Sequence, residues 1–305
     1  MRVAVTGAGG RLGRALVEAL EEAPFVGPSG PIPWDRAAFD LDAPAGIENL
    51  IVHDRPEAVI HAAAWTDVDG CAREPELALA RNGSATGTLA LACATRGVDL
   101  VVVSTNEVFD GRRMDGQGYG PADTPAPLNP YGASKLAGER AAADAFERAG
   151  GSAALGIVRT AWLFGPPGND FPAKILAAAE RSRDTGEPLR VVADEMGSPT
   201  YTRDLADGIV ELIGGAAIGG THHIVNQGIA SRAAWARELL RQARIDTPIV
   251  DVPASTWERA STPPAWGVLD PTSLPGGEPL RPWSAALADY LPTLLRQRAA
   301  SEARR

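Results

Sequence analysis

The 305-residue sequence is poor in several kinds of residue, and each shortage excludes a class of protein. Two cysteines, Cys71 and Cys93, are too few for a disulfide framework. No apolar run approaches the roughly 20 residues of a membrane-spanning helix, and the N-terminus does not resemble a signal peptide. The net charge of −9 argues against nucleic acid or an anionic membrane as a partner. We therefore expect a cytoplasmic protein whose ligands are small molecules.

Lysine is nearly missing as well. Of the 29 basic residues only Lys135 and Lys174 are lysines, and the others are arginines. Tyr131, one of only 4 tyrosines, stands four residues before Lys135. Chance placement predicts about 0.03 such pairs in a chain of this composition. The lysine ammonium group carries a compact charge, and its pKa shifts readily with its surroundings. We therefore interpret the lysine at position 135 as a functional residue.

The sequence around this pair predicts a helix. Asn129 can cap its first turn, and Pro130 suits the first helical position. Tyr131 and Lys135 then stand on one face. An ammonium roughly 5 Å from a phenol lowers the phenol pKa by about 2 at an effective dielectric of about 20, which favours proton transfer near neutral pH. We predict an acid/base couple in which Lys135 acidifies Tyr131; the alternative is an ordinary surface pair.

A phosphate-binding turn is predicted at the N-terminus. The β-branched run at residues 2–6 indicates a buried strand, and a helical pattern follows the turn. Gly7, Gly10 and Gly13 lie between them and would let the backbone approach a pyrophosphate at the helix N-terminus. Their Gly-x-x-Gly-x-x-Gly spacing differs from the commoner Gly-x-Gly-x-x-Gly, and a purely structural turn is the alternative.

The second strand is expected to be short or at a sheet edge, because three prolines surround Ile32. Asp35 and Arg36 follow it, in the range where a dinucleotide fold meets the adenosine ribose. Asp35 would accept a hydrogen bond from a 2′-hydroxyl, whereas Arg36, together with Arg11, would bind a 2′-phosphate. We favour Arg36 and therefore NADPH, with NADH as the alternative cofactor.

Two further strands are predicted at residues 58–62 and 99–104. The first ends in three alanines, at positions 62–64, whose small side chains leave room for a cofactor. The second delivers Thr105 to the same edge of the sheet. Its hydroxyl would share the substrate oxygen with Tyr131.

The whole pattern predicts an α/β fold, a doubly wound (Rossmann) parallel sheet with a smaller C-terminal α/β substrate lobe. We assign residues 1–165 to the NAD(P)-binding domain and 166–305 mainly to the substrate-binding lobe, with the chain crossing between them. Residues 111–128, rich in Gly and Pro, are expected to form a mobile loop over the site. We predict no metal site, since His222 and His223 are adjacent in a predicted strand and face opposite ways.

Seven motifs together resemble the extended short-chain dehydrogenase/reductases and, within them, the dTDP-4-dehydrorhamnose reductases. The resemblance covers nearly the whole chain. The motifs are TGAGGRLG (6–13), HAAAWTDVD (61–69), STNEVFDG (104–111), NPYGASKLAGE (129–139), RTAWLFG (159–165), GSPTYTRDLA (197–206) and LRPWSAAL (280–287).

The resemblance implies reduction of the C4 ketone of dTDP-4-dehydro-L-rhamnose by NAD(P)H, with Thr105, Tyr131 and Lys135 as the catalytic triad. The expected partners are the nucleotide sugar and, as one option, a second copy of the chain in a homodimer. We assign to the cofactor Gly7, Gly10, Arg11, Leu12, Gly13, Arg36, Asp40, Leu41, Ala62, Ala63, Ala64, Tyr131 and Lys135. We assign to the substrate Thr66, Val68, Asn106, Glu107, Trp162 and Ser198.

The chain departs from the family pattern at two places. Asn106 and Glu107 stand where the family usually has Asp-Tyr, and Gly267 stands where it tends to have Ser. The first departure, at Asn106 and Glu107, affects the prediction of which sugar the protein binds. The alternatives are a reductase of another 4-keto nucleotide sugar and a non-catalytic NADP-binding subunit like the β subunit of methionine adenosyltransferase. An epimerase–reductase like GDP-fucose synthase is disfavoured, because neither cysteine follows a catalytic strand.

Overall fold

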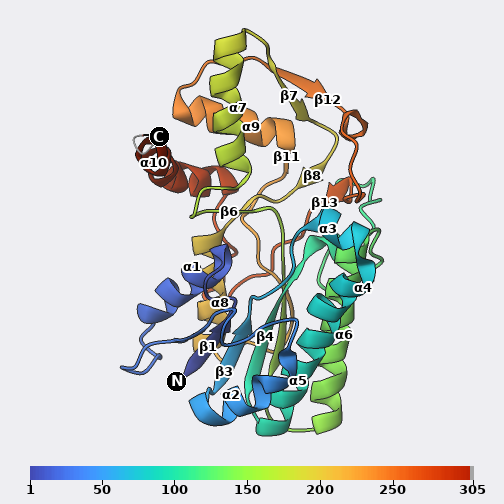
Figure 1. Ribbon diagram of the computed structural model, residues 1–305, viewed down its shortest axis with the longest axis vertical. Coiled ribbons are helices and arrows are strands. Elements are labelled where there is room, and N and C mark those ends of the chain that lie inside the picture. The colour runs from blue at the N-terminus through green and yellow to red at the C-terminus, as the bar shows by residue number, and fades with distance from the viewer. Residues whose placement is uncertain (303–305) are drawn as a thin grey trace.

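The computed structural model describes residues 1–302, which form two lobes (Figure 1). The larger lobe contains a six-stranded sheet of order β10-β5-β4-β3-β1-β2, in which every neighbouring pair is parallel. Its strands are β1 (Val3–Thr6), β2 (Ile32–Trp34), β3 (Ala58–His61), β4 (Asp99–Thr105), β5 (Leu155–Thr160) and β10 (Gly220–His223). The doubly wound α/β fold is thus confirmed, and β2 lies at the edge as expected.

Helices cover both faces of this sheet (Figure 1). Along the strands alternate side chains point to opposite faces, so that Val3 and Val5 join one core and Ala4 joins the other. The first face is covered by α1 (Arg11–Glu21) and α8 (Thr202–Gly214). The second is covered by α2 (Ile47–Asp54), α5 (Ala85–Arg96) and α6 (Pro130–Ala149). Before α5 the chain forms the short helices η1 (Pro44–Gly46), α3 (Val68–Arg73) and α4 (Pro75–Ala78) and the π-helix η2 (Leu79–Ser84).

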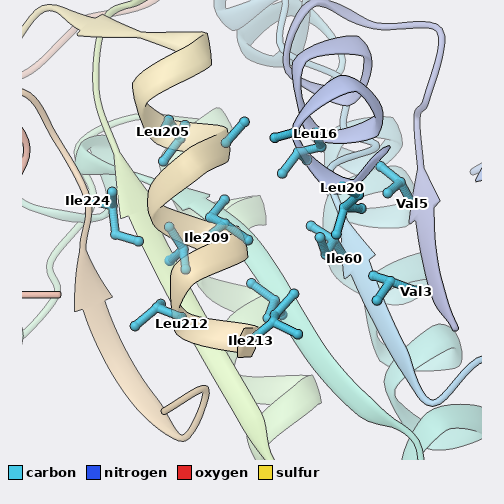
Figure 2. Close-up of a cluster of buried hydrophobic side chains, with 14 of the residues drawn as sticks. Val3, Val5, Leu16, Leu20, Ile60, Leu205, Ile209, Leu212, Ile213 and Ile224 are labelled. Carbon is cyan, nitrogen blue, oxygen red and sulfur yellow. The ribbon is translucent and has the colours of Figure 1, made fainter. Parts of the chain in front are cut away.

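Figure 2 shows the first core, in which Leu16 and Leu20 of α1 lie beside Leu205 and Ile209 of α8. Together they cover the strand side chains, including Ile60 of β3. Full burial of one such side chain contributes roughly 1.5–3 kcal/mol, so this packing fixes α1 and the turn before it against the sheet.

The smaller lobe, at the top of Figure 1, is built from the second half of the chain around its own apolar core. Its helices are α7 (Phe171–Thr185), α9 (Arg232–Ala243) and α10 (Trp283–Glu302), with η4 (Ala254–Thr256). Its strands and the lobe-connecting strands are β6 (Leu163–Phe164), β7 (Leu189–Val192), β8 (Met196–Gly197), β9 (Thr200–Tyr201), β11 (Ala230–Ser231), β12 (Ile249–Val252) and β13 (Trp266–Gly267). Between them the chain returns to the larger lobe to supply α8 and β10. None of the helices in residues 1–302 combines the length and apolarity that crossing a membrane requires.

The segment 111–128 has little regular structure, as expected, but its position differs from the prediction. It packs beside β13: Tyr119 is buried, its ring stacks on Phe109 at 4.3 Å between centroids, and its backbone N–H donates to the Val268 carbonyl at 2.9 Å. No residue of the segment lines either of the cavities described below. The placement of this loop over the site is therefore wrong, because a buried aromatic residue ties the segment to the outside of the site.

Candidate active site

Two adjoining cavities lie at the carboxyl ends of the parallel strands, where the strand order reverses between β1 and β3. The Tyr131 cavity has a volume of about 460 Å³, and the Arg36 cavity has about 300 Å³. Four residues of the loops after β1 and β3 line both: Gly7, Gly10, Ala62 and Ala64. Together the cavities form one long crevice, the shape that an extended dinucleotide requires.

The structure brings nearly every predicted site residue to this crevice. The Tyr131 cavity is lined by Gly7, Gly10, Arg11, Leu12, Gly13, Ala62, Ala64, Thr66, Val68, Thr105, Asn106, Glu107, Tyr131, Lys135 and Trp162, among others. The Arg36 cavity adds Arg36, Asp40, Leu41 and Ala63. Ser198 lies in the turn between β8 and β9 and lines neither cavity, since it is buried, with 1% of its surface exposed. Its assignment to the substrate is not supported.

The glycine turn is shaped for close approach by a ligand. Gly7 has φ +66°, and a Cβ there would lie 2.9 Å from the Ala63 backbone. A Cβ at Gly13 would lie 2.1 Å from the Gly7 carbonyl oxygen, so only glycine lets α1 pack this tightly on its own turn. The free N–H groups at the start of α1 face the crevice, a cradle that fits the pyrophosphate of a dinucleotide.

Arg36 lies at the far end of the crevice and is 79% exposed, with loose ion pairs to Asp40 at 3.8 Å and Asp42 at 3.5 Å. Asp42 is held more tightly by Arg81, at 2.6 Å. Asp35 does not line the cavity, since its carboxylate accepts hydrogen bonds from two backbone N–H groups of its own turn at 2.9 and 3.1 Å. The cation, and not the carboxylate, is therefore the residue available to a ribose substituent.

Arg11 does not assist Arg36. Its guanidinium turns toward the smaller lobe, where it donates to the carbonyls of Gly165 and Pro167 and pairs with the buried Asp170 at 3.3 Å. It lines the Tyr131 cavity but not the Arg36 cavity. The expectation that both arginines share a 2′-phosphate is wrong, because these contacts hold Arg11 at the junction of the lobes.

The helix that carries the Tyr-Lys pair begins as its sequence predicts. The Asn129 side chain accepts a hydrogen bond from the Gly132 backbone N–H at 2.8 Å, and Pro130 occupies the first position of α6. A Cβ at Gly132 would lie 2.0 Å from the Glu107 carbonyl oxygen, so α6 starts in direct backbone contact with the segment after β4. This contact places Tyr131 beside Thr105.

The side chains of Thr105 and Tyr131 are neighbours, since the Thr105 hydroxyl acts to lower the pKa of Tyr131, and both line the cavity. Thr105 ends β4 and its hydroxyl also accepts the Glu107 backbone N–H at 3.2 Å. Two hydroxyl groups held side by side in a cavity wall can both bind one substrate oxygen, and the phenol can give it a proton.

The electrostatics of Tyr131 differ from the prediction. Burial raises the pKa of Tyr131, with a further rise from the nearby Glu107 carboxylate, while the Thr105 hydroxyl acts in the opposite direction. Lys135 is not among the groups that shift it. Burial also lowers the pKa of Lys135, to about 8, with Glu139 opposing this change. The predicted acidification by Lys135 is wrong here, because loss of hydration disfavours the charged forms of both side chains and neither side chain shifts the pKa of the other.

Glu107 is one of the residues that line the Tyr131 cavity. Asn129 donates to its carboxylate at 2.7 Å, and burial raises the pKa of the Glu107 carboxyl against this hydrogen bond. Arg232, Glu195 and Arg259 are the other charged groups around it. The site therefore presents a carboxyl group close to the phenol of the acid/base pair.

The two departures from the family pattern are in contact with each other. The Asn106 side chain donates to the Gly267 carbonyl at 3.0 Å. A Cβ at Gly267 would lie 2.4 Å from the Asn106 amide nitrogen, so a larger residue would displace that side chain. Asn106 in the larger lobe and Gly267 in the smaller lobe thus act as a matched pair.

Arg232 and Arg81 are site residues that the sequence motifs did not reveal. The Arg232 guanidinium lies 3.5 Å from the centre of the Trp162 ring and lines the Tyr131 cavity. Arg81 lies 5.1 Å from the centre of the Trp65 ring in the Arg36 cavity. Neither stands in a recognisable motif, and 27 of the 29 basic residues are arginines, so composition gave no signal.

His61 is a buried residue of the core, as its place in a predicted strand suggested. The His61 ring is buried between the hydroxyls of Thr6, at 2.8 Å, and Thr86, at 3.1 Å, and burial lowers its pKa to about 3. Within the part of the chain that the structure describes, no group of three or more His, Cys, Asp or Glu side chains is arranged to hold a metal ion.

A doubly wound sheet, a glycine cradle at its switch point and a Thr-Tyr-Lys constellation in the same crevice define an oxidoreductase of the extended short-chain dehydrogenase/reductase class. A family model described as the RmlD substrate binding domain matches residues 1–296. The chain belongs to this family, that of the dTDP-4-dehydrorhamnose reductases.

Individual relatives agree with this assignment. The chain is 37% identical over 298 residues to dTDP-4-dehydrorhamnose reductase of Streptomyces griseus, covering 95% of this chain and 93% of the relative. It is 34% identical over 294 residues to dTDP-4-keto-6-deoxy-D-glucose reductase of Streptomyces niveus, covering 95% and 96%. The crystal structure of dTDP-4-dehydrorhamnose reductase from Bacillus anthracis in complex with NADP superposes with a TM-score of 0.84 at 31% identity, covering 96% of this chain and 99% of that one.

Proposed function

We propose that this protein reduces the C4 ketone of a nucleotide sugar, dTDP-4-dehydro-L-rhamnose, to the alcohol of dTDP-L-rhamnose. The observation that carries the proposal is the pair of neighbouring hydroxyl groups of Thr105 and Tyr131 in the wall of a cavity that continues into the glycine cradle. Membership of the dTDP-4-dehydrorhamnose reductase family supports the same substrate class.

The residues divide the work as follows. NADPH, held by the glycine cradle, supplies the hydride when bound. Thr105 donates a hydrogen bond to the C4 oxygen, and the Tyr131 phenol gives that oxygen a proton as it gains negative charge. Burial raises the pKa of Tyr131, which keeps the phenol protonated and ready to donate. Lys135 holds the nicotinamide ribose.

The substrate occupies the far end of the Tyr131 cavity. We assign Thr66 and Val68, from the loop after β3, and Asn106 and Glu107, after β4, to contacts with the sugar; all four line this cavity. Trp162 closes the wall that faces the smaller lobe. We assign residues 1–165 to the cofactor-binding domain and 166–305 mainly to the substrate-binding lobe, with α8 and β10 belonging to the first domain. The sugar contacts named above come from the first domain, so the second lobe would supply the rest of the substrate site.

Turnover of the purified protein tests the proposal directly. With NADPH and dTDP-4-dehydro-L-rhamnose, absorbance at 340 nm should fall at a rate proportional to enzyme, with dTDP-L-rhamnose as product. Tight NADPH binding without turnover of any 4-keto nucleotide sugar would contradict the proposal and favour the non-catalytic subunit.

A second candidate substrate is the 4-keto sugar without prior epimerisation, dTDP-4-keto-6-deoxy-D-glucose. The Glu107 carboxyl group in the cavity supports this candidate, since a carboxyl group can distinguish sugars by the positions of their hydroxyl groups. In addition, a relative at 34% identity is named as a reductase of that sugar. The two values of kcat/KM, measured side by side, separate the candidates.

Cofactor preference depends on Arg36. Arg36→Ala should raise the KM for NADPH by about 3- to 10-fold and leave the KM for NADH unchanged, because the guanidinium would pair only with a 2′-phosphate. Steady-state kinetics with both cofactors provide the measurement. An equal rise in KM for both cofactors would show that Arg36 does not distinguish a 2′-phosphate from a 2′-hydroxyl.

The cytoplasm is the compartment in which we place the protein, since its two cysteines are both free and buried. A homodimer stays a prediction, which the sedimentation coefficient of the purified chain tests.

A further inference from the structure

Arg232 is a cavity residue for which the catalytic scheme above has no use. It is the first residue of α9, whose N-terminus is capped by Ser231, so its backbone is fixed in the smaller lobe. Its guanidinium stacks on Trp162 at 3.5 Å from the ring centre. A charged group held flat on an aromatic ring in the wall of a cavity has few ways to move, and its N–H donors are pre-positioned.

The charges around Arg232 leave it incompletely neutralised. The buried Glu195 is shared between two guanidiniums, with Arg259 at 3.0 Å and Arg232 only at 3.8 Å. Glu107 is the remaining carboxyl that faces Arg232. Burial lowers the pKa of Arg232 to about 10, Glu195 opposes this change, and Arg259 adds to it. An anion in the cavity would relieve the imbalance.

We propose that Arg232 binds the diphosphate of the substrate, with Trp162 and Glu195 holding its guanidinium in the cavity wall. The inference rests on the proposed function in taking the substrate to be a nucleoside diphosphate sugar. Guanidinium forms paired hydrogen bonds with phosphate oxygens, which suits this ligand better than a neutral hydroxyl.

The order of the side chains along the cavity fits a sugar whose reacting carbon and diphosphate lie on opposite sides of the ring. Tyr131 and Glu107 are neighbours in this cavity, since the Glu107 carboxylate acts to raise the pKa of Tyr131. Glu107 in turn is close enough to Arg232 that the guanidinium acts to lower its pKa. Arg232 belongs to the smaller lobe, whereas the glycine cradle for the cofactor belongs to the larger, so the two diphosphates have separate sites.

Calorimetric titration separates this contact from turnover. With NADP⁺ saturating, dTDP and thymidine are titrated into wild type, Arg232→Ala and Arg232→Lys. Arg232→Ala should weaken dTDP binding by about tenfold or more and change thymidine binding less than twofold, because only dTDP carries the diphosphate. The dTDP affinity of Arg232→Lys should lie between the affinities of the wild type and of Arg232→Ala, since lysine keeps the charge and loses the planar pair of donors.

Arg237→Ala is the matched control. Arg237 lies on the same helix, is 47% exposed and pairs with Asp251 outside the cavity at 2.6 Å, so its removal should leave both affinities unchanged. Melting temperature and NADP⁺ affinity verify that each variant is folded.

Three results would overturn the inference: unchanged dTDP affinity in Arg232→Ala, equal losses for dTDP and thymidine, or no dTDP binding by the wild type. A KM increase for the nucleotide sugar without a loss of dTDP affinity would also overturn the inference. It would indicate that Arg232 contacts the sugar and not the diphosphate. A wild type that binds dTDP through Arg232 but reduces no ketone would remove the proposed function and leave the inference standing.

Discussion

Tyr131→Phe should lower kcat for ketone reduction by about 10²- to 10⁴-fold, the usual contribution of a positioned general acid. Phenylalanine keeps the ring in the cavity wall and removes the phenol hydroxyl beside Thr105. NADPH affinity should stay nearly unchanged, because Lys135 and the glycine cradle remain. Steady-state kinetics at 340 nm and a fluorescence titration of NADPH give the two quantities.

Tyr119→Phe is the matched control for this substitution. Its hydroxyl donates to Asp110 at 2.5 Å, and Tyr119 lines neither cavity. This variant should therefore retain the wild-type kcat despite losing a tyrosine hydroxyl. Wild-type turnover in Tyr131→Phe would remove Tyr131 from the mechanism.

Glu139→Ala should destabilise the protein by about 3–5 kcal/mol, the cost of leaving a buried charge without its partner. Glu139 of α6 and Arg159 of β5 form an ion pair at 2.7 Å with side chains only 7% and 6% exposed. Ser104 also donates to the Glu139 carboxylate. The alanine variant leaves the Arg159 guanidinium buried among β4, β5 and α6. Urea unfolding of both proteins gives the difference in the free energy of unfolding.

Asp144→Ala, on the same helix, is the control for this pair. Asp144 is 60% exposed and meets Arg148 at 3.5 Å, four residues later, so its loss should cost about 0.5 kcal/mol or less. Equal destabilisation by Glu139→Ala and Asp144→Ala would show that the buried pair does not anchor α6. The double variant Glu139→Leu with Arg159→Met should recover part of the loss, since no charge is then left buried.

The fold could be predicted from short-range sequence patterns, because the elements that these patterns predict are also the ones that the tertiary contacts stabilise. The strand at residues 2–6, the glycine turn and the Asn129 cap are all local features, and each appears where it was predicted. The segment 111–128 could not be placed in this way. What holds it is the burial of Tyr119 next to Val268, a contact across about 150 residues that no local pattern encodes.

The same division applies to the site. Thr105, Tyr131 and Lys135 are recognisable from the sequence because the first ends a strand and the other two stand four residues apart in one helix. Arg232 comes from a distant part of the chain, and the lobe packing alone brings it onto Trp162. Ser198 is the opposite case, since its motif suggested a substrate contact, whereas the structure buries its side chain in the turn between β8 and β9 and outside both cavities.

The class of fold, the glycine turn and the spacing of Tyr131 and Lys135 follow from the sequence alone, because each depends on residues close together in the chain. Only the tertiary structure decided the electrostatics of Tyr131, the orientation of Arg11 and the charged end of the cavity. These depend on burial and on charges brought together from both lobes, and the strength of both effects is set by the surrounding packing rather than by spacing along the chain.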